Sequence, residues 1–431
     1  MQVFYVATIL DDAIVPAGPS CIGFLISGNL RSSEVEQVSE WKEPVDLKEG
    51  SLRFAVRMYH ELSGEHKGNL FFSPLSMHAA LAMTYAGAKG ATAAEMARAL
   101  DYPIDAGKTV SEFGALLIRL SKPRSRDNKP AYQLNVVNAL WGQTGYPFAR
   151  EYADKMNKVM AAKLESLDFG QLEPARKRIN DWIDQQTNHC IVDVIPQGGI
   201  TPVTRLVLTN SIYFKSAWAD DYFKAENTKK AVFHASDHDV EVELMHTNRE
   251  FIYAENDACQ IVGIPYKDDD LRFILVLPRK KDGLADLERQ LTPGKVQQWM
   301  GTLFCPHVEL ALPRFKFENS IGLKPALRKL GMLKAFGVSA DFSGMLEKPC
   351  EGFNISEALH KSFVALDENG TEAAAATALM LKGEAAEEPE RVTVTADHPF
   401  LFLIDHPETG DIIFMGRVDN PTVAADDGDG R

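Results

Sequence analysis

The chain has 431 residues, of which 45% are hydrophobic, and its formal net charge is −14. Such a chain can bury a large core, and no Ser/Gly-rich or charge-only block divides residues 48–421, so we expect one large domain there. The acidic balance argues against nonspecific nucleic-acid binding, because phosphate contacts need Lys and Arg.

Both ends of the chain are expected to lie outside this domain. Residues 1–47 predict a weakly ordered extension without the basic start and cleavage site of a secretory signal. The apolar stretch 14–26 contains two prolines and is too short to span a bilayer, so no membrane segment is predicted. The compartment stays open between the cytoplasm and an extracellular location reached by another route. Residues 422–431 predict a disordered acidic tail.

The first elements of the domain predict a helix, a short strand and a buried helix. Residues 52–61 have helical apolar spacing, and the strand follows at 69–72. Ser73 and Pro74 then mark a helix start, with serine as the cap and proline in the first turn. The helix predicted over 75–86 is apolar on nearly all sides, which is typical of a buried helix.

Two polar features follow this helix. After a stop at 87–90, Thr92 and Glu95 have the spacing of a capping box for the next helix. The stretch from Lys122 to Lys129 is a basic loop that offers a site for a polyanion, although a solvated connector is the favoured interpretation.

The remainder of the domain alternates strands with helices and ends in a strand pair. The composition of these runs predicts an α+β fold, with helices clustered early and antiparallel sheets later. The strand-like runs cover 133–141, 206–214, 273–277 and 308–317, the helical runs cover 152–160, 175–186 and 324–333, and the final strands cover 400–404 and 411–418.

The sequence contains no recognisable catalytic or cofactor motif. It has no nucleophile elbow, no phosphate-binding loop and no dinucleotide fingerprint, and its eleven histidines form no ligand-spaced cluster. We therefore predict neither an enzyme nor a metal or cofactor site. The cysteines lack paired spacing and are odd in number, which predicts no disulfide framework; they are Cys21, Cys190, Cys259, Cys305 and Cys350.

The segment 368–383 joins a hydrophobic strand to a long acidic stretch. Within it, Thr371, Ala373, Ala375 and Thr377 occupy alternate positions and carry no charge. In an extended chain these side chains lie on one face, so the segment can stand exposed as a loop and later enter a sheet as an extra strand. Helix propensity leaves a solvated Ala-rich helix or linker as the alternative.

Across residues 48–421 the chain resembles the serpins, the serine protease inhibitor family. The resemblance is carried by separate motifs that occur in the family's order. They are residues 69–76 with Leu81, Gly87 and Thr92, residues 208–218, residues 358–372, and residues 397–400 with 414–421.

The resemblance implies three β-sheets, about nine helices and an exposed reactive-centre loop at about 369–396. It also implies the mechanism of the inhibitory members, which act as suicide substrates for a target serine protease. The protease cuts the loop and forms an acyl-enzyme, and the loop then enters the main sheet before the ester is hydrolysed. A monomer is expected, with the protease as its covalent partner.

The resemblance also assigns roles to named residues. A shutter holds the central strands together where they must part, a breach is the place where insertion begins, and a hinge is the first part of the loop to enter. Arg314 is expected to form a hydrogen-bonded ion pair with Glu368. The shutter is Ser73, Ser76, Asn210 and His360; the breach is Trp218, Arg314 and Glu368; the hinge is Glu368, Gly370, Thr371, Ala373, Ala375 and Thr377.

Family resemblance leaves two functions open, because some serpins carry hormones, assist folding or store protein without inhibiting a protease. The small uncharged hinge residues favour an inhibitor, since burying an unpaired charge there would cost several kcal/mol. Counting from Glu368 as in typical inhibitory members places the reactive bond at Glu384–Ala385 and suggests a glutamate-preferring protease. Lys382–Gly383 and Ala385–Ala386 are alternative bonds, and Arg391–Val392 lies too far along the loop.

Overall fold

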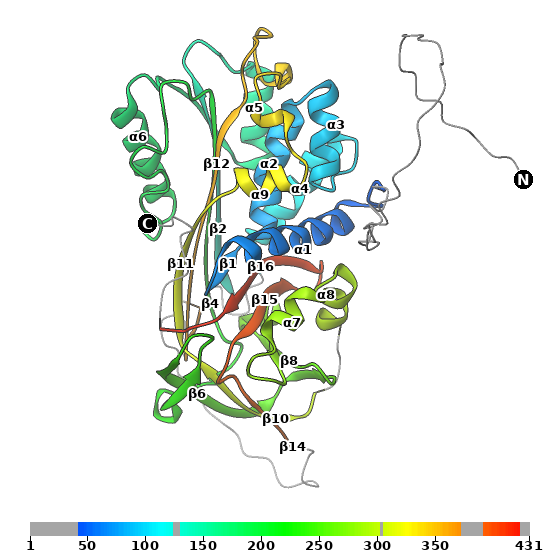
Figure 1. Cartoon of the computed structure of the whole chain (residues 1–431), viewed down its shortest axis with the longest axis vertical. Helices are drawn as coiled ribbons and strands as arrows, with labels where there is room; N and C mark the ends of the chain where they lie inside the picture. Colours follow the sequence, from blue (N-terminus) through cyan, green and yellow to red (C-terminus); the bar gives the residue numbers. More distant parts are fainter. Residues whose placement is uncertain (1–41, 124–129, 302–304, 372–390, 423–431) are drawn as a thin grey trace, which may run out of the picture. The chain divides into compact units, whose positions relative to one another are not determined.

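The computed structural model describes residues 42–123, 130–301, 305–371 and 391–422. Within these ranges, the side chain of Asp269 is not described. In Figure 1, α2, α3, α4, α5 and α9 lie together in one part, whereas α7 and α8 lie beside the strands of the smaller sheets in the other. Within these ranges there are nine α-helices: α1 Leu47–Glu65, α2 Pro74–Gly87, α3 Gly90–Ala99, α4 Ala106–Leu120, α5 Arg150–Met160, α6 Leu172–Gln186, α7 Leu284–Arg289, α8 Pro293–Met300 and α9 Lys324–Lys329.

The described strands form three sheets. The main sheet has the order β11-β12-β13-β4-β2-β3, the second β1-β16-β15-β9-β8-β7, and the third β14-β10-β6-β5. The strands are β1 Leu70–Phe72, β2 Tyr132–Gln143, β3 Lys163–Leu167, β4 Leu206–Ala217, β5 Lys229–His234, β6 Asp239–Glu250, β7 Ile252–Glu255, β8 Cys259–Pro265, β9 Arg272–Pro278, β10 His307–Pro313, β11 Phe315–Gly322, β12 Ile355–Asp367, β13 Gly370–Thr371, β14 Arg391–Thr395, β15 Phe400–His406 and β16 Asp411–Val418.

The predicted α+β fold with three sheets is confirmed, although only the second sheet is wholly antiparallel and the main and third sheets are mixed. The pairs β12–β4, β2–β3 and β10–β14 are parallel, and the other pairs are antiparallel. Parallel neighbours need long connections. The segment between β4 and β12 supplies the whole of the second sheet apart from β1, β15 and β16, and most of the third.

Helix α2 forms the centre of the core. All of its residues except Ala86 are buried, as its apolar surface predicts. It packs against α1, α4, β4 and β16, so it lies between the main and second sheets. Close packing at its end requires Gly87, because a Cβ atom there would lie 2.1 Å from Cγ of Met345. The start of α2 is therefore fixed beside β4 of the main sheet.

Helix α6 covers the opposite face of the main sheet, beside β2 and β12 in Figure 1. It packs there through a second apolar cluster. This cluster contains Ala139, Trp141, Phe169, Ala175, Ile179, Ile183 and Val207, with Leu359 and Phe363 packed against it. We call the α6 side the front face of the main sheet and the α2 side its core face.

Two local predictions are wrong. The run 308–317 is two strands in different sheets, because the chain turns at Arg314 between β10 and β11. Thr92 and Glu95 form no capping box, since α3 begins at Gly90 and has no side-chain cap. Instead, Thr92 accepts a hydrogen bond from the backbone of Asp341, and Glu95 accepts from the backbone after α9.

Candidate functional site

The candidate site is the seam between β12 and β4 in the main sheet. Over 355–363, β12 pairs directly with β4 in parallel. Closer to its C-terminal end, β13 lies between the two strands and is antiparallel to both. Gly370 is opposite Ala217, and Thr371 is opposite Ser216. The seam is therefore closed along most of its length and opened at one end by β13, which we call the wedge.

Each residue of the wedge fits its place for a specific steric or polar reason. Gly370 has φ +129°, and a Cβ atom there would lie 2.2 Å from the carbonyl oxygen of Ser216, so only glycine fits. Thr371 is fully buried, and its hydroxyl oxygen lies 2.7 Å from the hydroxyl of Tyr266. Since Thr371 points to the core face, the next residue along an extended chain would point to the front face.

The four predicted shutter residues meet in one buried hydrogen-bond network across the seam. Asn210 on β4 is directly opposite His360 on β12, and its side-chain oxygen lies 2.6 Å from Nδ1 of His360. The Asn210 amide nitrogen donates to the hydroxyl of Ser76. Ser73 caps α2 by accepting from the backbone N–H of Ser76, and donates to the carbonyl of Ile413 on β16. The network thus joins both strands of the seam to α2 and the second sheet.

The same network fixes the protonation state of His360. Its Nε2 accepts from the backbone N–H of Ser73, so Nδ1 carries the proton and donates to Asn210. A second ring proton, on Nε2, would point at the backbone N–H of Ser73, which is itself a donor, so the hydrogen bond would be lost. Burial alone lowers the pKa of His360 to about 3. The imidazole is therefore neutral at physiological pH.

Sequence reasoning missed a fifth member of this network, Asn138. It lies on β2 opposite Asn210, and its side-chain oxygen accepts from the Asn210 amide at 2.6 Å. The residue is buried, and its own amide nitrogen has no partner among the described residues. An asparagine inside the apolar strand run 133–141 was the signal that could have revealed it, because buried polar groups need partners.

The predicted ion pair of the breach is confirmed. Nε of Arg314 lies 2.7 Å from one carboxylate oxygen of Glu368, and Nη2 binds the other oxygen. Thr228 also donates to Glu368, and Arg314 binds Glu243 in addition. Burial raises the pKa of the Glu368 carboxyl, but the hydrogen bonds from Arg314 and Thr228 outweigh that effect and hold it below its usual range. The charged carboxylate is therefore stabilised beside the wedge.

Trp218, the third breach residue, holds the turn between β12 and β13. Its indole N–H donates to the carbonyl of Asp367 at 3.0 Å, and its backbone N–H donates to the carbonyl of Asn369 at 3.2 Å. The indole stacks on Tyr266 with ring centroids 4.8 Å apart. The same two aromatic residues therefore contact both the turn and the wedge.

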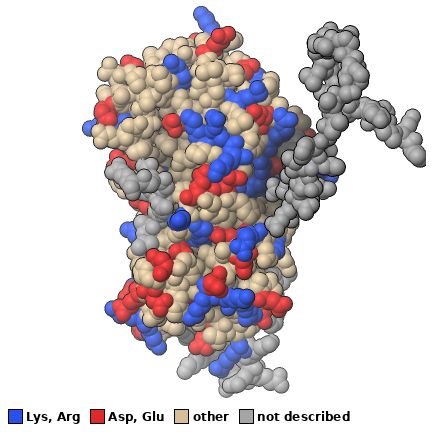
Figure 2. All heavy atoms as spheres, in the orientation of Figure 1, with Lys and Arg blue, Asp and Glu red and all other residues tan. Residues whose placement is uncertain are grey.

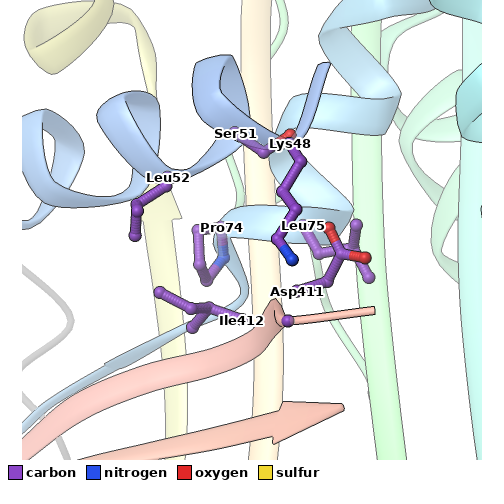
Figure 3. Close-up of a pocket in the computed structure, with 8 residues that line it drawn as sticks. Lys48, Ser51, Leu52, Pro74, Leu75, Asp411 and Ile412 are labelled. Atoms are coloured by element: carbon purple, nitrogen blue, oxygen red, sulfur yellow. The ribbon is translucent and has the colours of Figure 1, made fainter. Parts of the chain in front are cut away.

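A cavity of about 10 Å³ lies beside the start of α2, next to the shutter. In Figure 3, Lys48 from α1 and Asp411 from β16 approach each other at this cavity. Burial raises the pKa of Asp411, which the nearby Thr409 hydroxyl and the Lys48 charge only partly offset. The cavity has room for about one water molecule.

Several predicted residues lie outside the described ranges. These are the hinge residues Ala373, Ala375 and Thr377, the reactive-bond residues Glu384 and Ala385, and the basic loop after Pro123. The predicted loop limits, 369–396, also include two strands, because β13 precedes the undescribed segment and Arg391 begins β14 beside β10.

The described residues show no other chemical centre. They contain no group of acidic, histidine or cysteine side chains arranged to hold a metal ion. The four cysteines within these ranges form no disulfide bond. None of the described helices is both long enough and apolar enough to cross a bilayer.

The chain matches a known protein family along most of its length. The family model described as serpin (serine protease inhibitor) matches residues 49–421. An uncharacterised serpin-like protein of Thermococcus kodakarensis is 41% identical over 370 residues, which make up 85% of this chain and 84% of that protein. Serpin B6 of Pongo abelii is 38% identical over 384 residues, or 87% of this chain and 99% of its own.

Solved structures share the fold. Serpin48 of the insect Tenebrio molitor, described as a highly specific serpin, has a TM-score of 0.76 and 31% identity, with 86% of this chain and 97% of that chain covered. Human thyroxine-binding globulin, solved in complex with thyroxine, has a TM-score of 0.78 and 27% identity at the same coverage. Proteins of this fold therefore include one that binds a small molecule.

The shutter predicts acid sensitivity. Because the unfolded chain binds a proton near pH 6.5 and folded His360 only near 3, the stability from neutral His360 is present above pH 6.5 and is lost as the pH falls toward 3. For this residue, the unfolding free energy should fall by about 2 kcal/mol between pH 6.5 and 5. Urea unfolding of the wild type and His360→Gln at pH 7, 6 and 5 measures the difference. Equal pH dependence in both proteins would contradict the assignment.

The breach predicts a measurable loss when its ion pair is cut. Arg314→Ala leaves the Glu368 carboxylate, which is 9% exposed, without its main partner, and should cost about 1–3 kcal/mol of stability. Thermal unfolding at pH 7 measures the loss. Lys230→Ala, which cuts an exposed ion pair with Glu241 in the third sheet, is the control and should leave the midpoint unchanged. Similar midpoints for the two variants would mean that the breach pair does not restrain the fold.

Proposed function

The chain belongs to the serpin family, and we propose that it is an inhibitory member that acts as a suicide substrate for a serine protease. The protease serine attacks the carbonyl of Glu384, and the bond to Ala385 breaks as the new amine leaves. The loop then enters the seam between β4 and β12 before water hydrolyses the ester, and it carries the tethered protease away from its docking place.

The wedge is the observation that carries this proposal. Gly370 and Thr371 already pair with both strands of the seam, in the antiparallel direction that an inserted loop requires. Insertion extends an existing strand, which avoids the cost of starting a new one. The Thr371 side chain is fully buried on the core face. Every second residue after it would point to the same face of the sheet, so those side chains must be small or uncharged if they are to be buried there. Ala373, Ala375 and Thr377 meet that condition.

The register of the wedge also supports a role for Thr377 in the proposed insertion. Thr371 is opposite Ser216 and Leu366, so Thr377, six residues on, would come opposite Asn210 and His360, which are six residues earlier on the two strands. Insertion there breaks the hydrogen bond between His360 and Asn210. The Thr377 hydroxyl can both donate and accept, so it would pair these two buried groups again.

Small residues are also required on the front face. In the same register, Ala374 would lie between Tyr213 and Phe363, and Ala376 between Ser211 and Lys361. On the front face, Phe363 packs against the cluster that contains Trp141, and a small side chain would fit beside it without disturbing that contact. Steric fit on both faces therefore favours inhibition over a carrier, chaperone or storage role.

The length of the seam supports the proposed reactive bond Glu384–Ala385. Direct pairing of the two strands begins at Leu206 and Ile355, and the register brings Leu381 to Leu206. A cut after Glu384 leaves a strand that fills the seam and a short tether beyond it. Arg391–Val392 is unsuitable because Arg391 already pairs with His307 in the third sheet.

The distribution of charged side chains in Figure 2 affects how a protease would approach. Lys and Arg side chains are interspersed with Asp and Glu over the visible face of the molecule. The net charge of −14 is thus not gathered into one acidic field on that face. Recognition is therefore proposed to depend on the loop sequence, with the serpin acting as a monomer.

The proposal predicts that a charge at the wedge converts the inhibitor into a substrate. Thr371→Arg would bury a guanidinium beside Tyr266, so the loop should be cut without trapping the protease. Denaturing electrophoresis after incubation with the protease measures the covalent complex. Thr371→Ser keeps the size class and the hydroxyl and should still form it. If Thr371→Arg also forms the complex, insertion is not the mechanism.

The proposal also predicts the cleavage product. Incubation with a glutamate-specific serine protease should release a C-terminal fragment that begins at Ala385, and mass spectrometry identifies it. Trypsin-like and elastase-like proteases serve as comparisons for the bonds after Lys382 and Ala385. A covalent complex whose fragment begins at Gly383 or Ala386 would move the reactive bond. A cut that leaves the thermal midpoint of the protein unchanged would contradict loop insertion.

A further inference from the structure

An open cavity at the C-terminal end of α1 is separate from the seam. It lies where the end of α1, the turn between β5 and β6, the start of α7 and the end of β16 meet, and we call it the α1–α7 pocket. Its volume is about 970 Å³, and cavities that bind small molecules typically measure about 300–1,000 Å³. Its lining shares no residue with the shutter, the breach or the wedge, so ligand binding there can be tested independently of inhibition.

Buried polar side chains fix one wall of this pocket. Arg417, which is 7% exposed, donates through Nε to the carbonyl of Gly68 at 2.7 Å and through Nη2 to the carbonyl of His66. Asn69, which is 1% exposed, donates to the carbonyl of Asn420 at 2.7 Å. These bonds hold the chain that follows α1 against the end of β16. The wall is therefore already formed in the absence of a ligand.

The imidazole of His66 lines the pocket without an internal partner. The residue is 7% exposed, and its Nδ1 is buried. Neither ring nitrogen has a hydrogen-bond partner within the part of the chain that the structure describes. Buried polar groups are normally paired, so this ring needs a partner from outside. In either tautomer one ring nitrogen carries a proton and can donate to an acceptor that enters the pocket.

Lys67 supplies a positive charge next to His66 in the sequence. It is exposed, lines the pocket and makes no ion pair with any described residue. The other cations of the lining are engaged, because Arg417 binds Glu288 at 2.8 Å and Lys281 lies 3.8 Å from Asp397. A carboxylate in the pocket could accept a hydrogen bond from the imidazole and neutralise the Lys67 ammonium.

The acidic residues of the lining disfavour a second negative charge on the ligand. The carboxylate of Asp419 accepts from the hydroxyl of Ser236, and that of Asp237 lies 2.9 Å from Nδ1 of His238. Asp282 is exposed and has no counter-ion among the residues described. A dianion would therefore be repelled, whereas a single carboxylate can be placed beside Lys67.

Apolar side chains also line the pocket. They come from three segments, and they are Leu284 and Ala285 of α7, Ala235 of the turn between β5 and β6, and Pro399 before β15. An apolar ligand body would cover these groups and gain the free energy of removing both surfaces from water. Apolar walls with a few placed polar groups are the usual composition of a small-molecule site.

From these features we infer that the α1–α7 pocket binds a small molecule with one carboxylate on an apolar body, such as an aromatic or aliphatic acid. The carboxylate accepts a hydrogen bond from His66 and pairs with Lys67, and the body packs on α7 and on the turn between β5 and β6. The site is a binding site only and has no role in the cleavage of the loop.

The test uses 2-naphthoate, which carries one carboxylate on a flat apolar ring system. Titration calorimetry with the full chain measures its affinity, and 2-naphthalenemethanol is the neutral comparison. The acid should bind about five- to tenfold more tightly than the alcohol, the range for a hydrogen bond and an ion pair to a partly exposed charge. Binding should also raise the thermal midpoint of the protein.

Three variants locate the site. His66→Phe keeps an aromatic ring without the unpaired nitrogens, so affinity for 2-naphthoate should fall about tenfold while the midpoint of the free protein does not fall. Lys67→Glu should lower the affinity about fivefold. Lys177→Glu, at an exposed position of α6, makes the same change in net charge outside the pocket and should leave the affinity unchanged.

If His66→Phe does not fold, Ala285→Glu replaces it. Ala285 is exposed on α7 and lines the pocket, so the added carboxylate should weaken binding of the acid more than binding of the alcohol. The inference is overturned if millimolar 2-naphthoate neither releases heat nor raises the midpoint, or if the acid and the alcohol bind equally. It is also overturned if the pocket variants bind the acid as the wild type does.

Discussion

The hydrogen bond between His360 and Asn210 joins the two strands that must separate before any strand can enter the main sheet. It is one contact in a continuous parallel ladder, and its two residues tie that ladder to α2 and the second sheet through Ser76 and Ser73. Opening the seam therefore disturbs the centre of the core as well as the sheet. A fold built this way can hold the seam closed and still accept a strand, provided that the strand supplies equivalent partners.

Most of the fold could be predicted from the sequence because its buried elements are long and apolar. Helix α2 and strand β4 are found where the apolar runs indicated, and β12 is the hydrophobic strand expected before residue 368. The wrong predictions fall where tertiary contacts decide the outcome. Thr92 and Glu95 bond to backbone groups more than two hundred positions away, and no local pattern announces this. Likewise, an apolar run could not reveal that the chain changes sheets at Arg314.

The site was predicted in a similar way. Family motifs identified the residues on either side of the seam, and the ion pair between Arg314 and Glu368 followed from them. Asn138 was missed because it joins the network only through its register on β2, and register is set by the whole sheet. The wedge could not be predicted either. Whether Gly370 and Thr371 lie inside or outside the sheet depends on contacts with Ser216, Tyr266 and Trp218, which are remote in sequence.

The wedge lowers the free-energy cost of the first step of the proposed insertion. Starting a strand in a closed sheet requires separating paired strands before new hydrogen bonds form, so the first step is the most costly. Here the strands are already apart over Gly370 and Thr371, and the turn before them is held by Trp218 and by the bound Glu368. In the proposed mechanism, the remaining step would be propagation, in which each added residue exchanges one pairing of β12 with β4 for two pairings with the loop. The breach contacts therefore restrain the root of the loop and also keep the seam open at the position where propagation begins.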